Sequence, residues 1–258
     1  MKKIYLILLS ALLLLLVLSA CGDGPAVQSE LPMPVVTGAD EDESTEPTQA
    51  PVPGSSETDL SYSELYPASS TDMTALLPLS LGEGLEIIRV GSYSGVSIDS
   101  GEPEQVRDVF AVTLKNGGGA ALGSADFTVT TSLGTASFHV ECLPAGAAVD
   151  VCASEGGELG IGGSLAGAEL KSASFVEEPG VDGLEYAYES GKLNVTNTGA
   201  DIDGGLVVSL RIKGGSNYIG AVAIELELEG GLGSGETKTL AVPVYNGLSL
   251  EVVDTRSE

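Results

Sequence analysis

Few of the residue types that carry catalytic chemistry occur in this chain, and they are isolated from one another. The 258 residues include one histidine, His139. It lies between Phe138 and Val140 in an alternating segment, so we expect its side chain to point to solvent. A Ser-His-Asp hydrolase would also need a nucleophile motif such as Gly-x-Ser-x-Gly, which the sequence lacks. His139 is therefore predicted to be a surface residue.

Carboxylates are abundant, but their spacing is typical of a solvated surface. They cluster at Glu177-Glu178, at Asp201 and Asp203, and at Glu225, Glu227 and Glu229. A glycosidase needs two carboxyl groups at a set separation beside aromatic residues that stack on sugars, and this chain has no tryptophan. The loop 201–205 has oxygen ligands that suit Ca²⁺, but a polar Asx turn is the favoured interpretation. We predict no catalytic residue, no cofactor and no metal site, and hence no enzyme.

Four tyrosines are the best candidates for a binding patch. Exposed tyrosine side chains contribute much of the energy of protein interfaces. The candidates are Tyr186, Tyr188, Tyr218 and Tyr245. Tyr186 and Tyr188 share one face of a predicted strand, so one of them is expected to be partly exposed. The alternative, ordinary tyrosines packed within strands, stays open.

The charge of the chain excludes one class of partner. The 11 basic and 37 acidic residues give a formal net charge of −26. Nucleic-acid binding needs lysine and arginine to replace phosphate counterions, so we expect no nucleic-acid partner. We interpret the charge as that of a solvated, self-repelling surface, with the collection of Ca²⁺ or of cationic partners as the alternative.

The first 20 residues have the layout of a secretory signal. Two lysines precede an apolar run over residues 4–18, and small residues follow it. The stretch Leu18-Ser19-Ala20-Cys21 resembles the lipobox of bacterial lipoproteins. The resemblance implies a diacylglycerol thioether on Cys21 and cleavage before it. Two acyl chains, at about 0.8 kcal/mol per buried CH₂, are enough for stable attachment to a membrane. The alternative is a plain signal peptide and a soluble secreted chain.

Residues 21–84 comprise the lipidated cysteine and a predicted tether. This segment is rich in Pro, Ser and Thr, carries the acidic run Asp40-Glu41-Asp42-Glu43, and lies within a stretch without Lys or Arg from residue 4 to residue 88. It cannot bury enough apolar surface to offset its ordering entropy, so we expect it to be disordered. About 60 flexible residues span about 45 Å. A short helix over 71–81 is the one element expected in this segment.

Cys142 and Cys152 flank a predicted turn at residues 144–146. In an exported chain a disulfide between them is permitted. Face alternation argues against it, because Cys142 shares a face with Val140 whereas Cys152 shares one with Asp150, but a bulge could bring the two together. A disulfide and two free thiols both stay open.

Short strand patterns separated by turns recur from Leu85 onward. The clearest alternation covers residues 222–229, with apolar side chains on one face and carboxylates on the other. Residues 206–213 show the same pattern. Gly214-Gly215-Ser216-Asn217 lies between them and accepts positive φ, so the two segments are predicted to form a hairpin.

A weak internal repeat links the two parts of this region. Val112 to Gly118 and Leu193 to Gly199 each end an alternating strand in Asn-x-Gly. Leu143-Pro-Ala-Gly146 and Leu232-Gly-Ser-Gly235 follow later in the two copies. This pattern resembles the small immunoglobulin-like modules of bacterial surface proteins, of the FxLYD and CARDB kind.

The resemblance implies an all-β chain with two tandem immunoglobulin-like β-sandwich domains after the signal peptide and the disordered acidic linker. We place the first module at 85–160 and the second at 161–258, with the join in the glycine-rich stretch 156–167. Such modules serve as spacers, adhesion units or docking domains, and the fold alone does not choose among these roles.

We therefore expect a non-catalytic lipoprotein on the extracytoplasmic side of a cell membrane, either at the cell surface or in a periplasm. Its lipid on Cys21 would hold it to the membrane, and its modules would bind an extracellular or envelope protein, mediate adhesion, or act as a spacer. A lipoprotein that binds a glycan, a cell-wall fragment or a Ca²⁺-dependent ligand is the alternative. A hydrolase of the cell envelope is a remote one.

Overall fold

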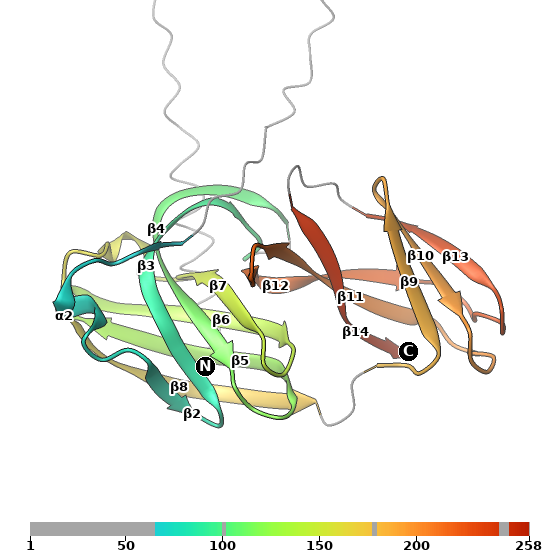
Figure 1. The fold of residues 1–258 in the computed structure, drawn as a ribbon, viewed down its shortest axis with the longest axis horizontal. Helices are drawn as coiled ribbons and strands as arrows, with labels where there is room; N and C mark the ends of the chain where they lie inside the picture. Colours follow the sequence, from blue (N-terminus) through green and yellow to red (C-terminus); the bar gives the residue numbers. More distant parts are fainter. Residues whose placement is uncertain (1–64, 100–101, 177–179, 243–247, 258) are drawn as a thin grey trace, which may run out of the picture. The chain divides into compact units, whose positions relative to one another are not determined.

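A computed structural model describes residues 65–99, 102–176, 180–242 and 248–257 (Figure 1). The described chain is nearly all β. The predicted signal peptide, Cys21 and the greater part of the predicted tether lie outside the described residues. No helix in the part of the chain that the structure describes is long and apolar enough to cross a membrane.

The elements fall into two halves, residues 65–176 and 180–257. In chain order the first half contains β1 (Tyr66–Pro67), α2 (Thr71–Thr74), β2 (Leu79–Gly82), β3 (Leu85–Ser97), β4 (Glu104–Asn116), β5 (Ala121–Thr131), β6 (Gly134–Leu143), β7 (Ala148–Cys152), the 3₁₀ helix η1 (Gly157–Leu159) and β8 (Leu165–Val176). The second half contains β9 (Leu184–Glu189), β10 (Lys192–Asn197), β11 (Leu206–Gly214), β12 (Asn217–Leu228), β13 (Thr237–Ala241) and β14 (Ser249–Ser257).

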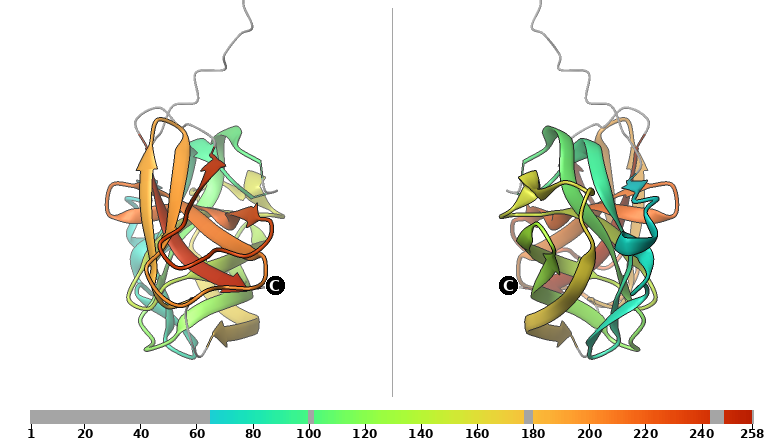
Figure 2. Two further views of the ribbon diagram at one scale, coloured as in Figure 1. Left: turned by 90° about the vertical axis from the view of Figure 1, so that its right-hand side faces the viewer. Right: turned by 90° about the vertical axis from the view of Figure 1, so that its left-hand side faces the viewer.

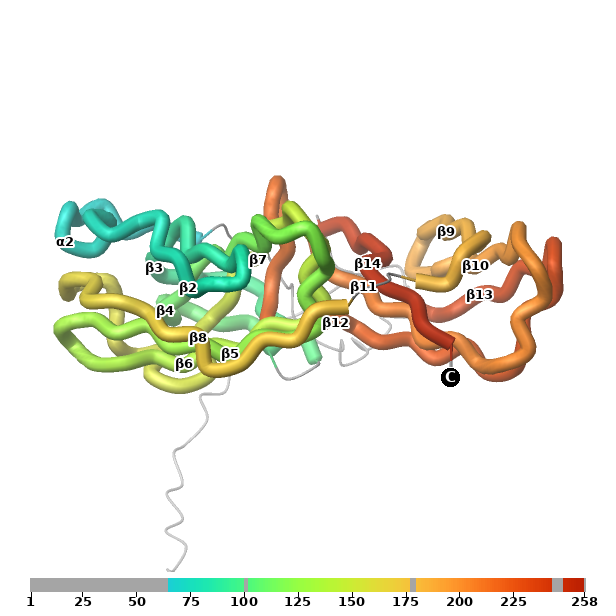
Figure 3. Tube along the Cα trace, turned by 90° about the horizontal axis from the view of Figure 1, so that it is seen from below, coloured from blue at the N-terminus to red at the C-terminus, as the bar shows by residue number. Residues whose placement is uncertain are grey.

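The first half is a sandwich of two groups of antiparallel strands, β3-β4-β7 and β6-β5-β8. Figure 3 shows β2 and β3 in one layer and β5, β6 and β8 in the other. The core between the layers is mostly aliphatic, with three phenylalanines among its buried residues. Phe127 stacks on Phe138 with ring centroids 5.1 Å apart, and Phe110 meets Phe138 edge-on at 5.9 Å. Alternation in β5 and β6 directs Phe127 and Phe138 inward and leaves hydroxyl and charged side chains outside.

The second half repeats this pairing order with β9-β10-β13 and β12-β11-β14. Strand by strand, β9 to β14 thus correspond to β3 to β8. Its buried core residues are all aliphatic. The predicted hairpin is confirmed, because β11 pairs antiparallel with β12 across the turn 215–216.

A buried asparagine marks the same point in each half and gives the repeat a physical basis. Asn116 Nδ2 donates to the carbonyl oxygens of Ala120 at 2.9 Å and Leu143 at 3.1 Å, and its Oδ1 accepts from Gly118 N at 3.1 Å. The main-chain oxygen of Asn116 accepts from Gly146 N at 2.7 Å. One side chain therefore joins the end of β4 to the turn before β7.

Asn197 makes the equivalent contacts at the end of β10. Its Nδ2 donates to the carbonyl oxygens of Ala200 at 2.7 Å and Leu232 at 2.8 Å, and its Oδ1 accepts from Gly199 N at 2.8 Å. Gly235 N donates to the main-chain oxygen of Asn197 at 2.7 Å. The two Asn-x-Gly motifs and the two Leu-x-x-Gly motifs thus meet in space as pairs.

A glycine ahead of each copy completes the motif. Gly84 and Gly183 have φ of +80° and +77°, and a Cβ on either would lie within 3 Å of the last glycine of the Asn-x-Gly motif, Gly118 or Gly199. Their sequence contexts match as well, Glu83-Gly84-Leu85-Glu86 against Asp182-Gly183-Leu184-Glu185. Only glycine fits such a close approach at positive φ.

The last part of the predicted tether is folded. β1 and β2 pair with β3, and Met73 in α2 is fully buried in the first core. Figure 2 (right) shows this turquoise segment beside the green strands of the first half. The boundary of the tether at residue 84 is therefore corrected to before residue 65. The apolar residues Leu77, Leu79 and Leu81 explain the difference, because they pack against the first core.

The predicted boundary between residues 160 and 161 also needs correction. β8 lies beyond it, yet it pairs with β5 from Leu165 to Val176. The glycine-rich stretch 156–167 is a connection within the first half, and the change of halves falls between residues 176 and 180. The composition of that stretch resembles a linker because its glycines make turns, two of them with positive φ.

One sheet continues from the first half into the second. β7 pairs parallel with β12 through Val149 with Tyr218 and Asp150 with Ile219. The resulting sheet has the order β1-β3-β4-β7-β12-β11-β14, with β2 also paired to β3. The described residues from 65 onward also fall within one compact unit.

Candidate functional site

The sole histidine lies on the outer face of β6, as predicted, between two carboxylates. His139 Nδ1 is 2.8 Å from Asp126 Oδ1, and Nε2 is 3.0 Å from Glu141 Oε1. Burial by itself would lower the pKa of His139, but the hydrogen bonds with Glu141 and Asp126 outweigh it, so this pKa lies above its usual value. The hydrogen bond from His139, with a second from Ser172 at 2.8 Å, lowers the pKa of Asp126.

This arrangement does not activate a serine. Ser172 Oγ donates to Asp126, not to the imidazole, and both ring nitrogens of His139 are engaged by carboxylates. A Ser-His-Asp hydrolase needs the histidine between the serine and the acid. The cluster is a polar ladder across three strands of an exposed sheet face.

The two cysteines of the folded part are free, so the disulfide that the sequence left open is not formed. Cys142 lies near the end of β6 with φ of +47°, and the β5–β6 register does not shift there. Cys152 pairs with Ala111 in the other sheet of the sandwich. The two cysteines thus lie in different layers of the sandwich. Burial raises the pKa of Cys152 to about 12, and burial and the nearby Asp254 raise that of Cys142.

The four tyrosines do not form one surface. Tyr218 is buried and lies beneath the cationic ends of Lys213 and Arg211. Tyr245 lies outside the described residues. Tyr186 is half-buried, with its hydroxyl 2.6 Å from Thr255 Oγ1. Tyr188 remains exposed, with 39% of its surface accessible. Burial raises the pKa of Tyr186 and, to about 12, that of Tyr218.

The carboxylates of the second half fix loops. Asp201 Oδ1 accepts from Ser234 N at 2.7 Å, and Glu236 Oε2 accepts from Gly233 N at 2.8 Å. Within the described ranges, no group of three or more His, Cys, Asp or Glu side chains is arranged to hold a metal ion. Asp201 thus ties its own loop to the turn that contains Ser234.

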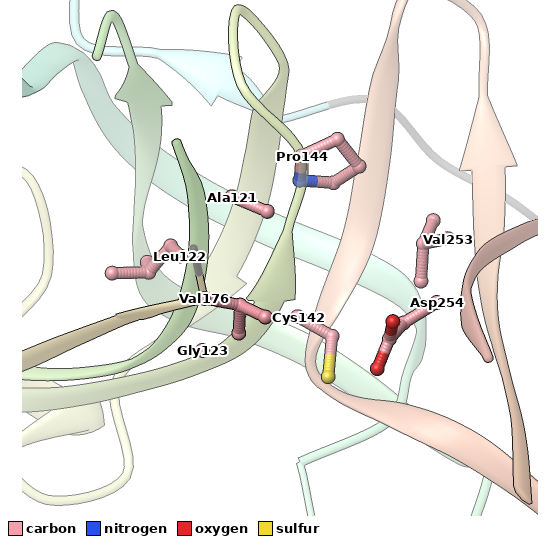
Figure 4. A pocket seen from close by; sticks show the side chains of 8 residues that line it. All are labelled: Ala121, Leu122, Gly123, Cys142, Pro144, Val176, Val253 and Asp254. Atoms are coloured by element: carbon pink, nitrogen blue, oxygen red, sulfur yellow. The ribbon is translucent and has the colours of Figure 1, made fainter. Parts of the chain in front are cut away.

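Hollows near the junction of the halves are small or open. The pocket in Figure 4 has a volume of about 20 Å³, which accommodates about one water molecule. In it, the sulfur of Cys142 and the carboxylate of Asp254 lie near each other across the gap between β6 and β14 (Figure 4). A wider cleft of about 440 Å³ adjoins it along β14. Its one cationic side chain, Arg256, is held by Glu225 at 2.7 Å.

A buried arginine joins the two halves, and the sequence did not predict it. Residues 206–213 were expected to present Ser209, Arg211 and Lys213 to solvent, but Ser209 is fully buried and Arg211 is 1% exposed. The guanidinium of Arg211 donates to the carbonyl oxygens of Glu141 in the first half and of Gly220 in the second. Burial lowers its pKa to about 10. The outer face of β11 is covered, so the prediction of a half-buried strand was wrong here.

A second buried polar group lies where β7 meets β12. Asp150 Oδ1 accepts from Thr113 Oγ1 at 2.6 Å and from Asn217 Nδ2 at 3.0 Å. Because buried carboxylates are costly unless they are hydrogen-bonded, this network favours the pairing of these particular strands.

The segment that follows β3 also holds β12. Val222 N donates to Ile98 O at 3.1 Å, and Ala221 N donates to Asp99 Oδ1 at 3.0 Å. Burial raises the pKa of Asp99. A separate apolar cluster fills the space between the halves; it contains Leu65, Tyr93, Val96, Ile98, Ala111, Cys152, Ile212 and Ile219.

Comparison with known proteins gives no match. No family model matches this chain, and no curated protein or solved structure matches it. The function must therefore be inferred from the residues themselves.

Proposed function

We propose that this chain is a non-catalytic lipoprotein, anchored on the extracytoplasmic side of a membrane by a lipid on Cys21, that presents two joined immunoglobulin-like modules to a partner protein. The lipobox-like stretch at residues 18–21 supports the anchor. The matching strand order of the two halves and their paired asparagines support the modules.

The observation that carries the proposal is the junction between the halves. It combines parallel pairing of β7 with β12, the buried Arg211 and Asp150, and its own apolar cluster. Two modules that move independently on a flexible linker need none of these contacts. A protein that presents a surface in a fixed geometry does need them, because pre-organisation lowers the entropic cost of binding.

The polar clusters of the described residues support binding better than catalysis. His139 and Asp126 lie on an exposed sheet face, and the carboxylates of the second half cap loop backbones. These are features of a scaffold that carries its function on its surface.

The anchor is tested by fractionating cells that express the wild-type chain, Cys21→Ala and, as the matched control, Cys142→Ala. We expect the wild type and Cys142→Ala in the membrane fraction, with the mass of a diacylglycerol on the peptide that begins at residue 21. Cys21→Ala should lose both. Retention of Cys21→Ala in the membrane with an unchanged peptide mass would refute the anchor.

The partner role is tested by crosslinking on intact cells, followed by mass spectrometry of the captured proteins. We expect one protein to be enriched, and its capture to fail with a chain whose junction is disrupted by Asp150→Lys. Equal capture of many proteins, or of none, would refute a docking role and would favour a spacer or a glycan-binding lipoprotein.

A further inference from the structure

No strand among the described residues pairs with the outer edge of β9 in the second half. β9 is the last strand of β13-β10-β9. Its pair Glu189 with Lys192 closes a two-residue turn in which Ser190 and Gly191 both have positive φ. Hydrogen-bonded pairs alternate from such a turn, so the backbone groups of Leu184, Tyr186 and Tyr188 point away from β10.

The equivalent edge of the first half is covered. β2 pairs antiparallel with β3 there, with Leu79 opposite Ile87 and Ser80 opposite Glu86. Through the repeat, Ile87 and Glu86 correspond to Tyr186 and Glu185, because each glutamate follows a Gly-Leu and each pair lies opposite the same strand positions. The internal repeat therefore shows what kind of segment this edge accepts: an extended one, in antiparallel pairing, with an apolar side chain on the core side.

Nothing among the described residues of the second half takes the place of β2. Val181 packs against the second core just ahead of β9, and no described backbone group bonds the outer edge of the strand. Exposed edge strands are normally protected by lysine, proline or a bulge. β9 has the sequence LEYAYE and pairs with β10 without a register shift, so it has no lysine, proline or bulge, and its only charged side chains are glutamates.

The side chains of β9 indicate the chemistry of its partner. Glu185 and Glu189 are exposed and share the solvent face, whereas Tyr186 and Tyr188 share the other face. Alternate residues of a strand added at this edge would point to opposite faces of the sheet. One set would lie beside the glutamates and the other set beside the tyrosines. Opposite charges across a strand pair are favourable and like charges are not.

We propose that the outer edge of β9 is the partner-docking site of this protein, and that it binds an extended segment of another protein in which lysine or arginine alternates with apolar residues. This inference rests on the proposed docking function and specifies its site. Backbone pairing would provide affinity, and the alternation of glutamate with tyrosine would provide selectivity.

A second copy of this chain is the less favoured occupant. Antiparallel pairing of two β9 strands about Ala187 places Glu185 of one copy opposite Glu189 of the other, twice. Each chain also carries a formal net charge of −26. Both features oppose self-pairing, so the acidic edge selects for a basic strand.

The test uses the chain from residue 21 onward with Cys21→Ser, which keeps it in solution, and four octapeptide probes. The first alternates lysine with valine, the second alternates glutamate with valine, the third has the first composition in two blocks, and the fourth is the first with N-methyl groups at alternate residues. Affinity is measured by fluorescence anisotropy. Amide exchange at β9 is measured with and without the first peptide.

We expect the alternating lysine peptide to bind at least tenfold more tightly than the other three and to slow exchange at Tyr186 and Tyr188. Glu185→Lys combined with Glu189→Lys should weaken binding at least tenfold. Glu227→Lys combined with Glu229→Lys, at two exposed glutamates of the same half, is the matched control and should leave affinity within twofold. Circular dichroism of all variants checks that they are folded, and the N-methyl peptide tests strand pairing without any substitution.

Equal binding of the N-methyl or the acidic peptide, or protection at another strand, would overturn the inference. So would a dimer in sedimentation velocity whose formation protects β9, because the occupant would then be a second copy. If the peptides fail but crosslinking on cells still captures one protein, docking holds and uses another surface. If both fail, the proposed function fails with its site.

Discussion

Replacing Asn197 with alanine should lower the free energy of unfolding by about 3 kcal/mol. The wholly buried side chain makes three hydrogen bonds, two as donor at 2.7 and 2.8 Å and one as acceptor at 2.8 Å. Each is worth about 1 kcal/mol net, and removing the amide leaves two carbonyl oxygens and one N–H buried without it. For a domain of this size the loss corresponds to a decrease in Tm of about 6–12 °C.

The assay is urea unfolding at pH 7, followed by far-ultraviolet circular dichroism. Asn116→Ala is the paired variant and should cost about as much, because Asn116 makes equivalent contacts in the first half. Asn194→Ala is the control; its side chain accepts a surface hydrogen bond from Thr239 Oγ1 at 2.7 Å, and its loss should cost about 0.5 kcal/mol or less. If Asn197→Ala and Asn194→Ala lower the free energy of unfolding by amounts within about 1 kcal/mol of each other, the hydrogen bonds of the buried asparagine do not stabilise the fold as we reason.

Two further predictions concern titrating groups. The pKa of His139 in the folded chain lies above its ordinary value of 6.5, so the stability it contributes is fully present below about pH 6.5 and is lost as pH rises through the folded pKa. The wild type should therefore exceed His139→Gln in stability more at pH 5 than at pH 9, by less than about 1 kcal/mol because the site is exposed; an equal difference at both values, measured by urea midpoints, would contradict the predicted pKa direction. In the Cys21→Ser chain, a thiol reagent at pH 8 should modify Cys142 slowly and Cys152 only after unfolding, because burial raises the pKa of Cys152 to about 12. Two thiols per chain should react in urea. If no thiol reacts in urea, the two cysteines form a disulfide.

Much of the fold could be predicted from turn chemistry and alternation. The Asn-x-Gly and Leu-x-x-Gly motifs were sufficient to suggest a repeat, because Asn116 and Asn197 need the same partners in both copies. The strands of the β11–β12 hairpin followed from period-two alternation. The Gly-Leu-Glu sequences at 84–86 and 183–185 are a third mark of the repeat.

The candidate sites were harder to predict, because they depend on contacts between distant segments. Arg211 is an alternating polar residue in its own strand, and the carbonyl oxygens of Gly220 and of Glu141, 70 residues away, explain its burial. Tyr186 and Tyr218 look alike in sequence, but one is at an edge strand and the other lies under Arg211 and Lys213. The segment 65–82 was assigned to the tether from its composition. Composition does not show that the apolar side chains of this segment pack against the first core.

The pairing of β7 with β12 has a consequence for dissecting this protein. β12 belongs to the second half, yet it completes the sheet of the first and covers Asp150 and the outer face of β4 and β7. A fragment that stops near residue 176 would expose a buried carboxylate, a thiol and an unpaired strand edge together, and such edges promote aggregation. The two halves thus depend on each other for folding. We expect a gene fragment that encodes only one of them to give no stable protein, so the two halves should be expressed, inherited and lost together.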